Sequence, residues 1–135
     1  MYKTCLKYRV PYADTDQMSV VYYANYFVYF ERSRNELLRE AGLPYTMFEE
    51  QGIMLPVIEA HCDYKNAACY DDELEIYVGF AEIKGCRVKV VNEIYCKGKL
   101  LVKGYTRHAF ISSETRKPTK APAHFYEVIT ARLED

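Results

Sequence analysis

The sequence predicts an α+β domain in which an antiparallel sheet wraps one long helix. Residues 22–41 carry apolar side chains at the spacing of an amphipathic helix. Three alternating segments follow between residues 73 and 111, joined by short turns that contain glycine. The 135 residues show no internal repeat and no low-complexity linker, so we expect a single domain over residues 1–135.

The helix at residues 22–41 is expected to organise this domain, because about twenty residues is long for a helix in a small protein. A short strand over residues 6–10 precedes it. Gly42 followed by Pro44 provides the signal that ends it. The apolar stripe of this helix consists of Tyr23, Phe27, Phe30, Leu37 and Ala41.

After this helix the pattern changes to β-structure. A brief helix is expected at residues 45–50, ended by Gly52. One strand is expected over residues 53–64, with an interruption near Pro56. Residues 73–83 alternate between apolar and more polar side chains, which indicates a strand with one buried face. The residues on that apolar face are Leu74, Ile76, Val78 and Phe80.

Two further strands are expected at residues 87–96 and 100–111, each after a glycine-containing turn. Together with residues 73–83 they form an antiparallel meander. Residues 112–122 are polar and hold two prolines, which is typical of a loop. A C-terminal helix is expected over residues 125–133.

Composition and charge exclude several classes of protein. The net charge is −1 with both signs mixed along the chain, whereas a dedicated nucleic-acid binder usually carries a basic excess. No apolar run has transmembrane length and the first residues lack the apolar block of a signal peptide. We therefore expect a cytoplasmic protein without stable membrane insertion. Five cysteines without a CxxC pair and three dispersed histidines argue against disulfides and against a metal site.

The most informative segment is YADTDQMSVVYYANY at residues 12–26, which places Asp14 and Asp16 on a short loop ahead of the long helix. A helix start offers free backbone N–H groups and the positive end of the helix dipole, which can hold a developing oxyanion. A carboxylate beside these donors can act as base or nucleophile on the same carbonyl. The segment therefore favours acyl transfer or hydrolysis, with Asp16 as the preferred catalytic residue.

The residues of this loop also have structural interpretations. Asp16 near a helix start is a common N-cap or dipole partner. Asp14 either contributes to substrate binding or pins the loop through local hydrogen bonds. The backbone N–H groups around Tyr22 and Tyr23 are the expected oxyanion donors, and Tyr22 is also a candidate for substrate binding.

Three residues that follow are candidates for substrate binding because they lie near the start of the helix. Asn25 and Tyr26 are within reach of a pocket at that position, and Glu31 lies further along. Glu31 has an alternative role, because Arg34 and Asn35 are placed to pair with it on the helix surface.

Several short motifs together resemble the hotdog-fold thioesterases, in the branch of the 4-hydroxybenzoyl-CoA thioesterase and the YbgC-like acyl-CoA thioesterases. The similarity runs over about residues 8–122, nearly the whole chain. The matching motifs are YADTD at 12–16, VVY at 20–22, NY at 25–26, FERSR at 30–34, YDDEL at 70–74 and GYTRH at 104–108.

The resemblance implies a hotdog fold, with a central helix wrapped by a five- or six-stranded antiparallel sheet. It implies a homodimer or homotetramer with active sites at the subunit interface. Asp16 matches the catalytic carboxylate of the family, and the N–H of Tyr23 matches the amide that polarises the thioester carbonyl. The resemblance implies no metal or redox cofactor, and coenzyme A enters as part of the substrate.

Two positions depart from the family pattern. Ser19 stands where the family usually has Gly, in the tight turn before the helix. If that position requires a positive φ, Ser adds strain of about 1 kcal/mol or shifts the loop. Tyr23 replaces a His that is common in the YbgC-like group, which removes an imidazole but keeps the backbone amide. The cations considered for the phosphates of coenzyme A are Lys84, Arg87, Lys89, Arg116, Lys117 and Lys120.

The leading function is therefore hydrolysis of an acyl-CoA or aroyl-CoA to the free acid and coenzyme A. One alternative is a thioesterase that acts on acyl-carrier protein, which presents the same phosphopantetheine arm. Another is a non-catalytic protein that binds or senses acyl-CoA, an interpretation to which Ser19 and Tyr23 lend support. A hotdog dehydratase is disfavoured. By resemblance, dehydratases of this fold pair an acidic residue with a His on the loop and helix, and no His precedes residue 51 here.

Overall fold

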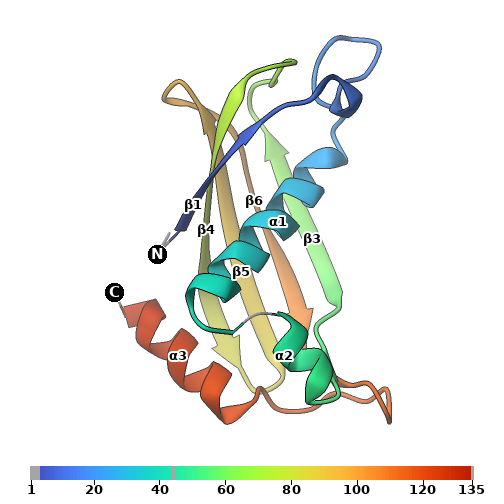
Figure 1. The fold of residues 1–135 in the computed structure, drawn as a ribbon, viewed down its shortest axis with the longest axis vertical. Coiled ribbons are helices and arrows are strands. Elements are labelled where there is room, and N and C mark those ends of the chain that lie inside the picture. Colours follow the sequence, from blue (N-terminus) through green and yellow to red (C-terminus); the bar gives the residue numbers. More distant parts are fainter. Residues whose placement is uncertain (1–3, 44, 135) are drawn as a thin grey trace.

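The long helix α1 (Asn25–Glu40) lies against one face of a five-stranded antiparallel sheet (Figure 1). The computed structural model describes residues 4–43 and 45–134, without the side chains of residues 132–134. The predicted hotdog architecture is confirmed, with five strands in the main sheet. In spatial order the strands are β1 (Thr4–Arg9), β4 (Glu73–Lys84), β5 (Arg87–Cys96), β6 (Lys99–Ala109) and β3 (Val57–Tyr64).

Strands β4, β5 and β6 form the predicted meander at the centre of the sheet. The apolar face predicted for β4 is confirmed, because all four of its side chains are buried. Strand β1 pairs with the other side of β4, with Thr4 opposite Val78. Strand β3 pairs with β6, with Tyr64 opposite Val102, and this leaves β3 at an edge of the sheet.

The strand predicted over residues 53–64 is two strands with different partners. The short strand β2 (Ile53–Met54) pairs with β7 (Ile111–Ser112), outside the main sheet. The break falls at Pro56, which has no backbone N–H to donate to a neighbouring strand. The prediction of one strand over residues 100–111 was wrong in the same way, since β6 ends at Ala109 and Ile111 belongs to β7.

Helix α1 begins at Asn25, three residues after the predicted start. The N–H groups of Asn25, Tyr26 and Phe27 donate to carbonyl oxygens three residues earlier, so residues 22–24 form a tight turn instead of α-helix. The predicted end is confirmed within one residue. Gly42 has a φ of 77°, and the N–H of Leu43 donates to the carbonyl of Leu38 across a glycine-terminated helix end.

The face of α1 that packs on the sheet differs from the predicted stripe. Phe30 and Leu37 are buried as predicted, but Tyr23 precedes the helix and is 60% exposed. Tyr and Phe occupy several sides of the first helical turns, so spacing alone left the buried face ambiguous. The residues of α1 that are buried are Tyr26, Tyr29, Phe30, Ser33, Arg34, Leu37 and Leu38.

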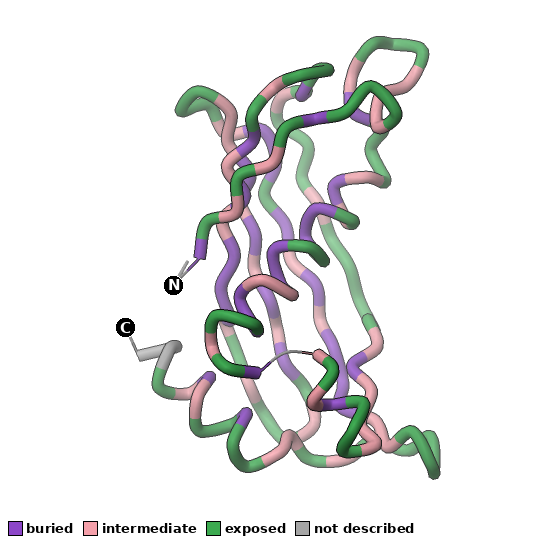
Figure 2. The backbone as a smooth tube through the Cα atoms, in the orientation of Figure 1, coloured by how far each residue is buried: buried purple, intermediate pink, exposed green. Residues whose placement is uncertain are grey.

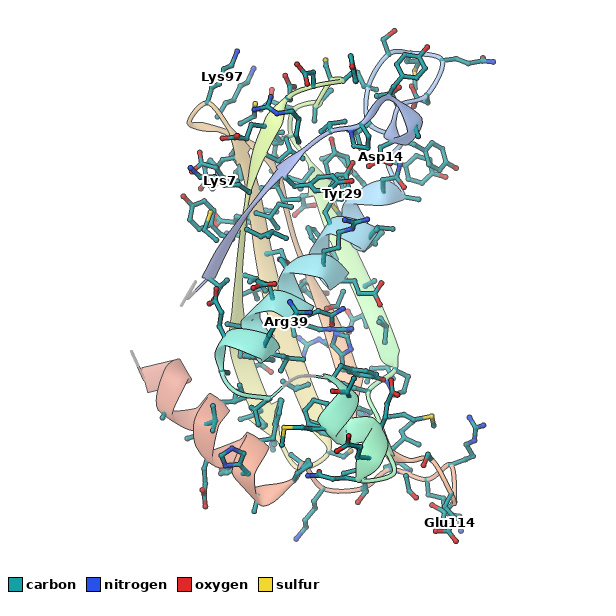
Figure 3. The ribbon with its side chains drawn as sticks, viewed as in Figure 1. Lys7, Asp14, Tyr29, Arg39, Lys97 and Glu114 are labelled. Atoms are coloured by element: carbon teal, nitrogen blue, oxygen red, sulfur yellow. The ribbon has the colours of Figure 1, made fainter. Side chains whose placement is uncertain are left out.

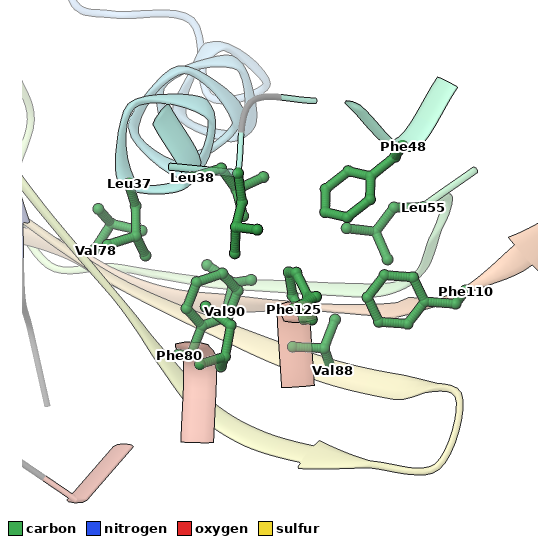
Figure 4. Close-up of a cluster of buried hydrophobic side chains, with 12 residues drawn as sticks. Leu37, Leu38, Phe48, Leu55, Val78, Phe80, Val88, Val90, Phe110 and Phe125 are labelled. Carbon is green, nitrogen blue, oxygen red and sulfur yellow. The ribbon is translucent and has the colours of Figure 1, made fainter. Parts of the chain in front are cut away.

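Two short elements close the end of the molecule where α1 finishes. Helix α2 (Tyr45–Glu50) was predicted with these bounds, and helix α3 (Ala123–Glu134) begins two residues earlier than predicted. Their rings Phe48 and Phe125 meet Phe110 in edge-to-face contacts at 4.9 to 6.1 Å (Figure 4). In the part of the chain that the structure describes, no helix is long and apolar enough to cross a membrane.

Strand β3 is exposed over most of its length, as the green tube in Figure 2 shows. One of its edges bonds to β6, and the other carries no strand within residues 4–43 and 45–134. Three large apolar side chains on it are about half exposed: Val57, Ile58 and Tyr64. An exposed apolar edge of this kind is a surface on which a further strand can pair.

Candidate active site

Residues 12–24 form a compact loop that is held by backbone hydrogen bonds, both within the loop and to a neighbouring segment. A 3₁₀ turn, η1 (Tyr12–Asp14), leads into a small bridge between Thr15 and Val21. Inside it, the N–H of Asp16 donates to the carbonyl of Val20 at 2.9 Å. Val21 N–H in turn donates to Ala68 at 2.8 Å, which anchors the loop to the chain before β4. These hydrogen bonds therefore fix the backbone conformation at Asp16, the residue that carries the carboxylate.

Asp14 holds this loop against helix α1. Its Oδ2 accepts hydrogen bonds from the hydroxyls of Tyr29 at 2.7 Å and Tyr8 at 3.3 Å, and Figure 3 shows Asp14 next to Tyr29. Its backbone carbonyl accepts from the N–H of Tyr22 and from Nδ2 of Asn25, both at 2.9 Å. Burial and the nearby carboxylate raise the pKa of Tyr29, which keeps its hydroxyl a donor. These contacts agree with the loop-pinning interpretation of Asp14.

Asp16 lines a pocket of about 340 Å³ whose walls are mostly apolar. Its Oδ1 accepts the N–H of Met18 at 2.8 Å, and its Oδ2 accepts no hydrogen bond from the described residues. Tyr23 and Tyr26 line the same pocket from the start of α1, and Tyr64 lines it from the end of β3. The remaining lining residues are Met18, Val20, Val21, Lys65, Asn66 and Ala67.

The turn before α1 contains two backbone N–H groups that donate no hydrogen bond to the described residues. The carbonyls of Tyr22 and Tyr23 accept from the N–H groups of Asn25 and Tyr26, at 2.9 and 3.4 Å. The N–H groups of Tyr23 and Ala24 have no acceptor among the residues described. They therefore lie at the positive end of the helix dipole with their hydrogen-bonding capacity free. This is the arrangement needed to hold an oxyanion.

Tyr64 contacts this turn from the opposite wall of the Asp16 pocket. Its hydroxyl donates to the carbonyl of Tyr23 at 3.0 Å, and its ring lies edge-on to those of Tyr23 and Tyr26. Burial raises the pKa of Tyr64 to about 12, so the hydroxyl remains a donor near neutral pH. Sequence reasoning missed Tyr64 and Lys65, because they lie some forty residues after the loop and follow no recognisable motif.

The structure does not bring every candidate residue into this pocket. Tyr22 is exposed beside it, with its ring 4.7 Å from that of Tyr23. Asn25 is engaged with the backbone of Asp14, as described above. Glu31 lies further along α1 in a second pocket, where its Oε1 is 3.8 Å from Nη2 of Arg34. The expected pairing of Glu31 with Arg34 is therefore present.

The six cations considered for coenzyme A lie at the end of β4, in the first residues of β5 and in the loop between β7 and α3. These segments are at the end of the molecule opposite the loop that precedes α1 (Figure 1). Within one copy of the chain, Lys65 is instead the cation that lines the Asp16 pocket. The five cysteines are free, and burial raises the pKa of Cys62 to about 11, which keeps that thiol protonated. Over the described ranges, no cluster of three metal-ligating side chains occurs.

This geometry defines a class of protein. A central helix wrapped by an antiparallel sheet, with a loop carboxylate that lines the same pocket as the turn before the helix, is a hotdog fold of the thioesterase type. The sequence model of the thioesterase-like superfamily matches residues 10–129, and the chain belongs to this family. It is an acyl-CoA thioesterase-like hotdog protein.

Individual relatives match along most of their length. The acyl-CoA thioesterase YbgC of Haemophilus influenzae is 34% identical over 115 residues, which cover 84% of this chain and 85% of that one. The YbgC of Helicobacter pylori strain J99 is 29% identical over 136 residues, covering 93% and 99%.

Solved structures give the same result. The DHNA-CoA thioesterase from Staphylococcus aureus has a TM-score of 0.91 at 27% identity, with 95% of this chain and 89% of that chain covered. Protein TT1821 from Thermus thermophilus has a TM-score of 0.92 at 29% identity, with 96% and 99% covered. Since the match extends over whole chains, the likeness concerns the complete fold and not one motif.

Proposed function

We propose that this protein hydrolyses acyl-CoA or aroyl-CoA thioesters to the free acid and coenzyme A. The observation that carries the proposal is the shared pocket of Asp16 and Tyr23, in which a carboxylate oxygen and a backbone N–H are both without partners among the described residues. Mostly apolar walls suit an acyl or aromatic group. Relatives named as acyl-CoA thioesterases favour coenzyme A over acyl-carrier protein as the thiol carrier.

In this mechanism the thioester oxygen accepts from the N–H of Tyr23 while Asp16 stands beside the carbonyl carbon. Asp16 either removes a proton from an attacking water, or attacks the carbon to form an anhydride that water then opens. Both routes consume one water, break the C–S bond and release coenzyme A as its thiol. The Tyr23 N–H stabilises the negative charge that forms on oxygen in either route.

We also propose that the working unit is a homodimer or homotetramer with active sites between copies. The exposed edge of β3 supports this, because pairing of two β3 strands satisfies backbone groups that otherwise face solvent. Tyr64 at the end of β3 also lines the Asp16 pocket, so such pairing places a second copy next to the site.

The decisive variant is Asp16→Asn, which keeps an oxygen for the Met18 N–H but can neither take up a proton nor attack the carbonyl. Hydrolysis is expected to fall by about 10²- to 10⁴-fold, with folding and assembly unchanged. The measurement is release of free thiol from a panel of straight-chain and aromatic acyl-CoAs, with wild type and variant assayed in parallel.

A matched control is Asp71→Asn, which removes an exposed carboxylate 3.9 Å from Arg9. Its backbone is left-handed with a φ of 70°, a conformation that Asn tolerates, and its activity should equal that of the wild type. Near-wild-type hydrolysis by Asp16→Asn would contradict the role of Asp16. Binding of acyl-CoA by the wild type without turnover would favour the carrier-protein or sensing alternatives.

A further inference from the structure

A second pocket, of about 270 Å³, lies between α1 and β3 and contains a buried cation. Its walls are largely apolar, and its polar members are Glu31, Arg34, Thr106 and His108. The apolar lining residues are Phe27, Val28, Phe30, Val57 and Ala60. It shares no residue with the Asp16 pocket, and the proposed mechanism does not use it.

Arg34 is the unusual member of this pocket because it is only 8% exposed and its hydrogen-bonding capacity is largely unused. Its Nη2 donates to Asn35 at 3.2 Å and lies 3.8 Å from Glu31, whose side chain is mainly in solvent. Its Nε is fully enclosed, and neither Nε nor Nη1 donates to any residue in the described part of the chain. The guanidinium also lies over the ring of Tyr45, with Cζ 6.0 Å from the ring centroid, in a cation–π contact.

The neighbouring histidine adds no charge to this pocket, because burial and the positive charge of Arg34 lower its pKa to about 4. His108 is fully buried, with Nδ1 3.3 Å from the carbonyl of Leu55 and Nε2 2.8 Å from the hydroxyl of Thr106. A carbonyl only accepts, so Nδ1 carries the proton and Nε2 accepts from Thr106. The imidazole is therefore neutral and internally satisfied. Arg34 remains as a buried guanidinium with free N–H groups in an apolar pocket, which is a setting that favours a carboxylate.

We propose that this second pocket binds a carboxylate at the far end of the acyl group, so that the preferred substrates are thioesters of dicarboxylic acids. The inference rests on the proposed thioesterase function. The guanidinium recognises the anion, and the apolar walls contact the methylene chain between the two ends.

The two pockets cooperate across two copies of the chain. Within one copy, Arg34 lies eleven residues after Tyr23, most of them in α1, and at the rise of a helix this is roughly 16 Å, which exceeds the reach of a short acyl chain. If two β3 strands pair antiparallel about their middle, Tyr64 of one copy lies opposite Val57 of the other. That arrangement places the Asp16 pocket of one copy against the Arg34 pocket of its partner.

The test compares thioesters matched in length that differ at the far end: butanoyl-CoA with butanedioyl-CoA, and the corresponding C6 and C8 pairs. For the pair whose carboxylate reaches Arg34, wild-type kcat/KM should favour the dicarboxylic substrate by at least about tenfold. Arg34→Met, which is similar in length but uncharged, should abolish this preference. Arg39→Met is the matched control, because Arg39 is exposed on the same helix. This variant should keep the wild-type preference for the dicarboxylic substrate.

A wild type that prefers the methyl-ended substrate at all three lengths would overturn the inference, and this result does not depend on whether Arg34→Met folds. If no thioester is cleaved, the proposed hydrolysis fails separately. Calorimetric binding then decides the inference: wild type should bind hexanedioyl-CoA more tightly than hexanoyl-CoA, and Arg34→Met should bind both alike. Equal binding of the two ligands by the wild type would contradict a carboxylate site.

Discussion

At the scale of single residues, Ser19 carries backbone strain in the loop that holds Asp16. Its φ of 66° lies in the left-handed region, which costs a residue with a Cβ about 1 kcal/mol. Its N–H donates to the carbonyl of Asp16 at 3.0 Å, so the strained turn positions the backbone of the candidate catalytic residue. Of the two consequences expected for Ser at this position, the structure shows strain within an intact turn.

Replacing Ser19 with Gly should therefore stabilise the protein by roughly 0.5 to 1 kcal/mol, because glycine adopts this φ without a steric cost. Urea denaturation monitored by circular dichroism measures the change. The control is Ser113→Gly, an exposed serine outside the left-handed region, which should be neutral or slightly destabilising. Equal effects of the two substitutions would show that the Ser19 turn is not strained.

At the same scale, the sequence could identify the part of the site that is local. Asp16 and Tyr23 are seven residues apart and meet through one loop, so a motif was sufficient to place them together. Tyr64 at the end of β3 and Lys65 directly after it line the same pocket, and their contribution depends on how that strand packs against the start of α1. No local pattern encodes such a contact.

At the scale of secondary-structure elements, the edge strand β3 is the element on which the proposed assembly depends. Its residues were predicted as a strand, but nothing in their alternation showed that the strand lies at an edge. Its position follows from pairing with β6 alone. Because β3 borders both pockets, any partner that covers this edge also covers the site.

Ala60→Arg tests this role by placing a long charged side chain in the exposed middle of β3. In a symmetric pairing two such cations approach each other, so the variant should shift to monomers and lose hydrolysis. Light scattering after size-exclusion chromatography measures the mass. Ala131→Arg, at an exposed position on α3, should leave both assembly and activity unchanged. A wild type that is monomeric and active would contradict the dimer proposal.

At the scale of the whole molecule, a buried neutral imidazole links folding to pH. His108 belongs to β6, with Nδ1 next to the carbonyl of Leu55 in the segment before β3, and burial lowers its pKa from the usual 6.5 to about 4. The unfolded chain therefore takes up the proton at a higher pH than the folded chain does. The stabilisation of the folded state by neutral His108 is fully present above about pH 6.5 and is lost progressively as the pH falls toward 4.

The expected loss for wild type between pH 7 and pH 4 is roughly 3 kcal/mol from this group. His108→Gln should lack this component, although it is less stable than wild type at pH 7 because the buried hydrogen bonds change. Denaturant titrations of both proteins across this range measure the difference. Parallel pH profiles for the two would mean that His108 does not control the acid sensitivity.

The sequence by itself determined most of the elements of this protein and the loop part of its candidate site. Alternation in the meander, helical spacing in α1 and the Asp14–Asp16 loop are properties of neighbouring residues, and they predicted the fold class and the family correctly. Only the tertiary structure decided the position of β3 at the edge of the sheet, the pairing of β2 with β7 and the burial of Arg34. These features depend on hydrogen bonds and packing between segments distant along the chain, which no local pattern contains.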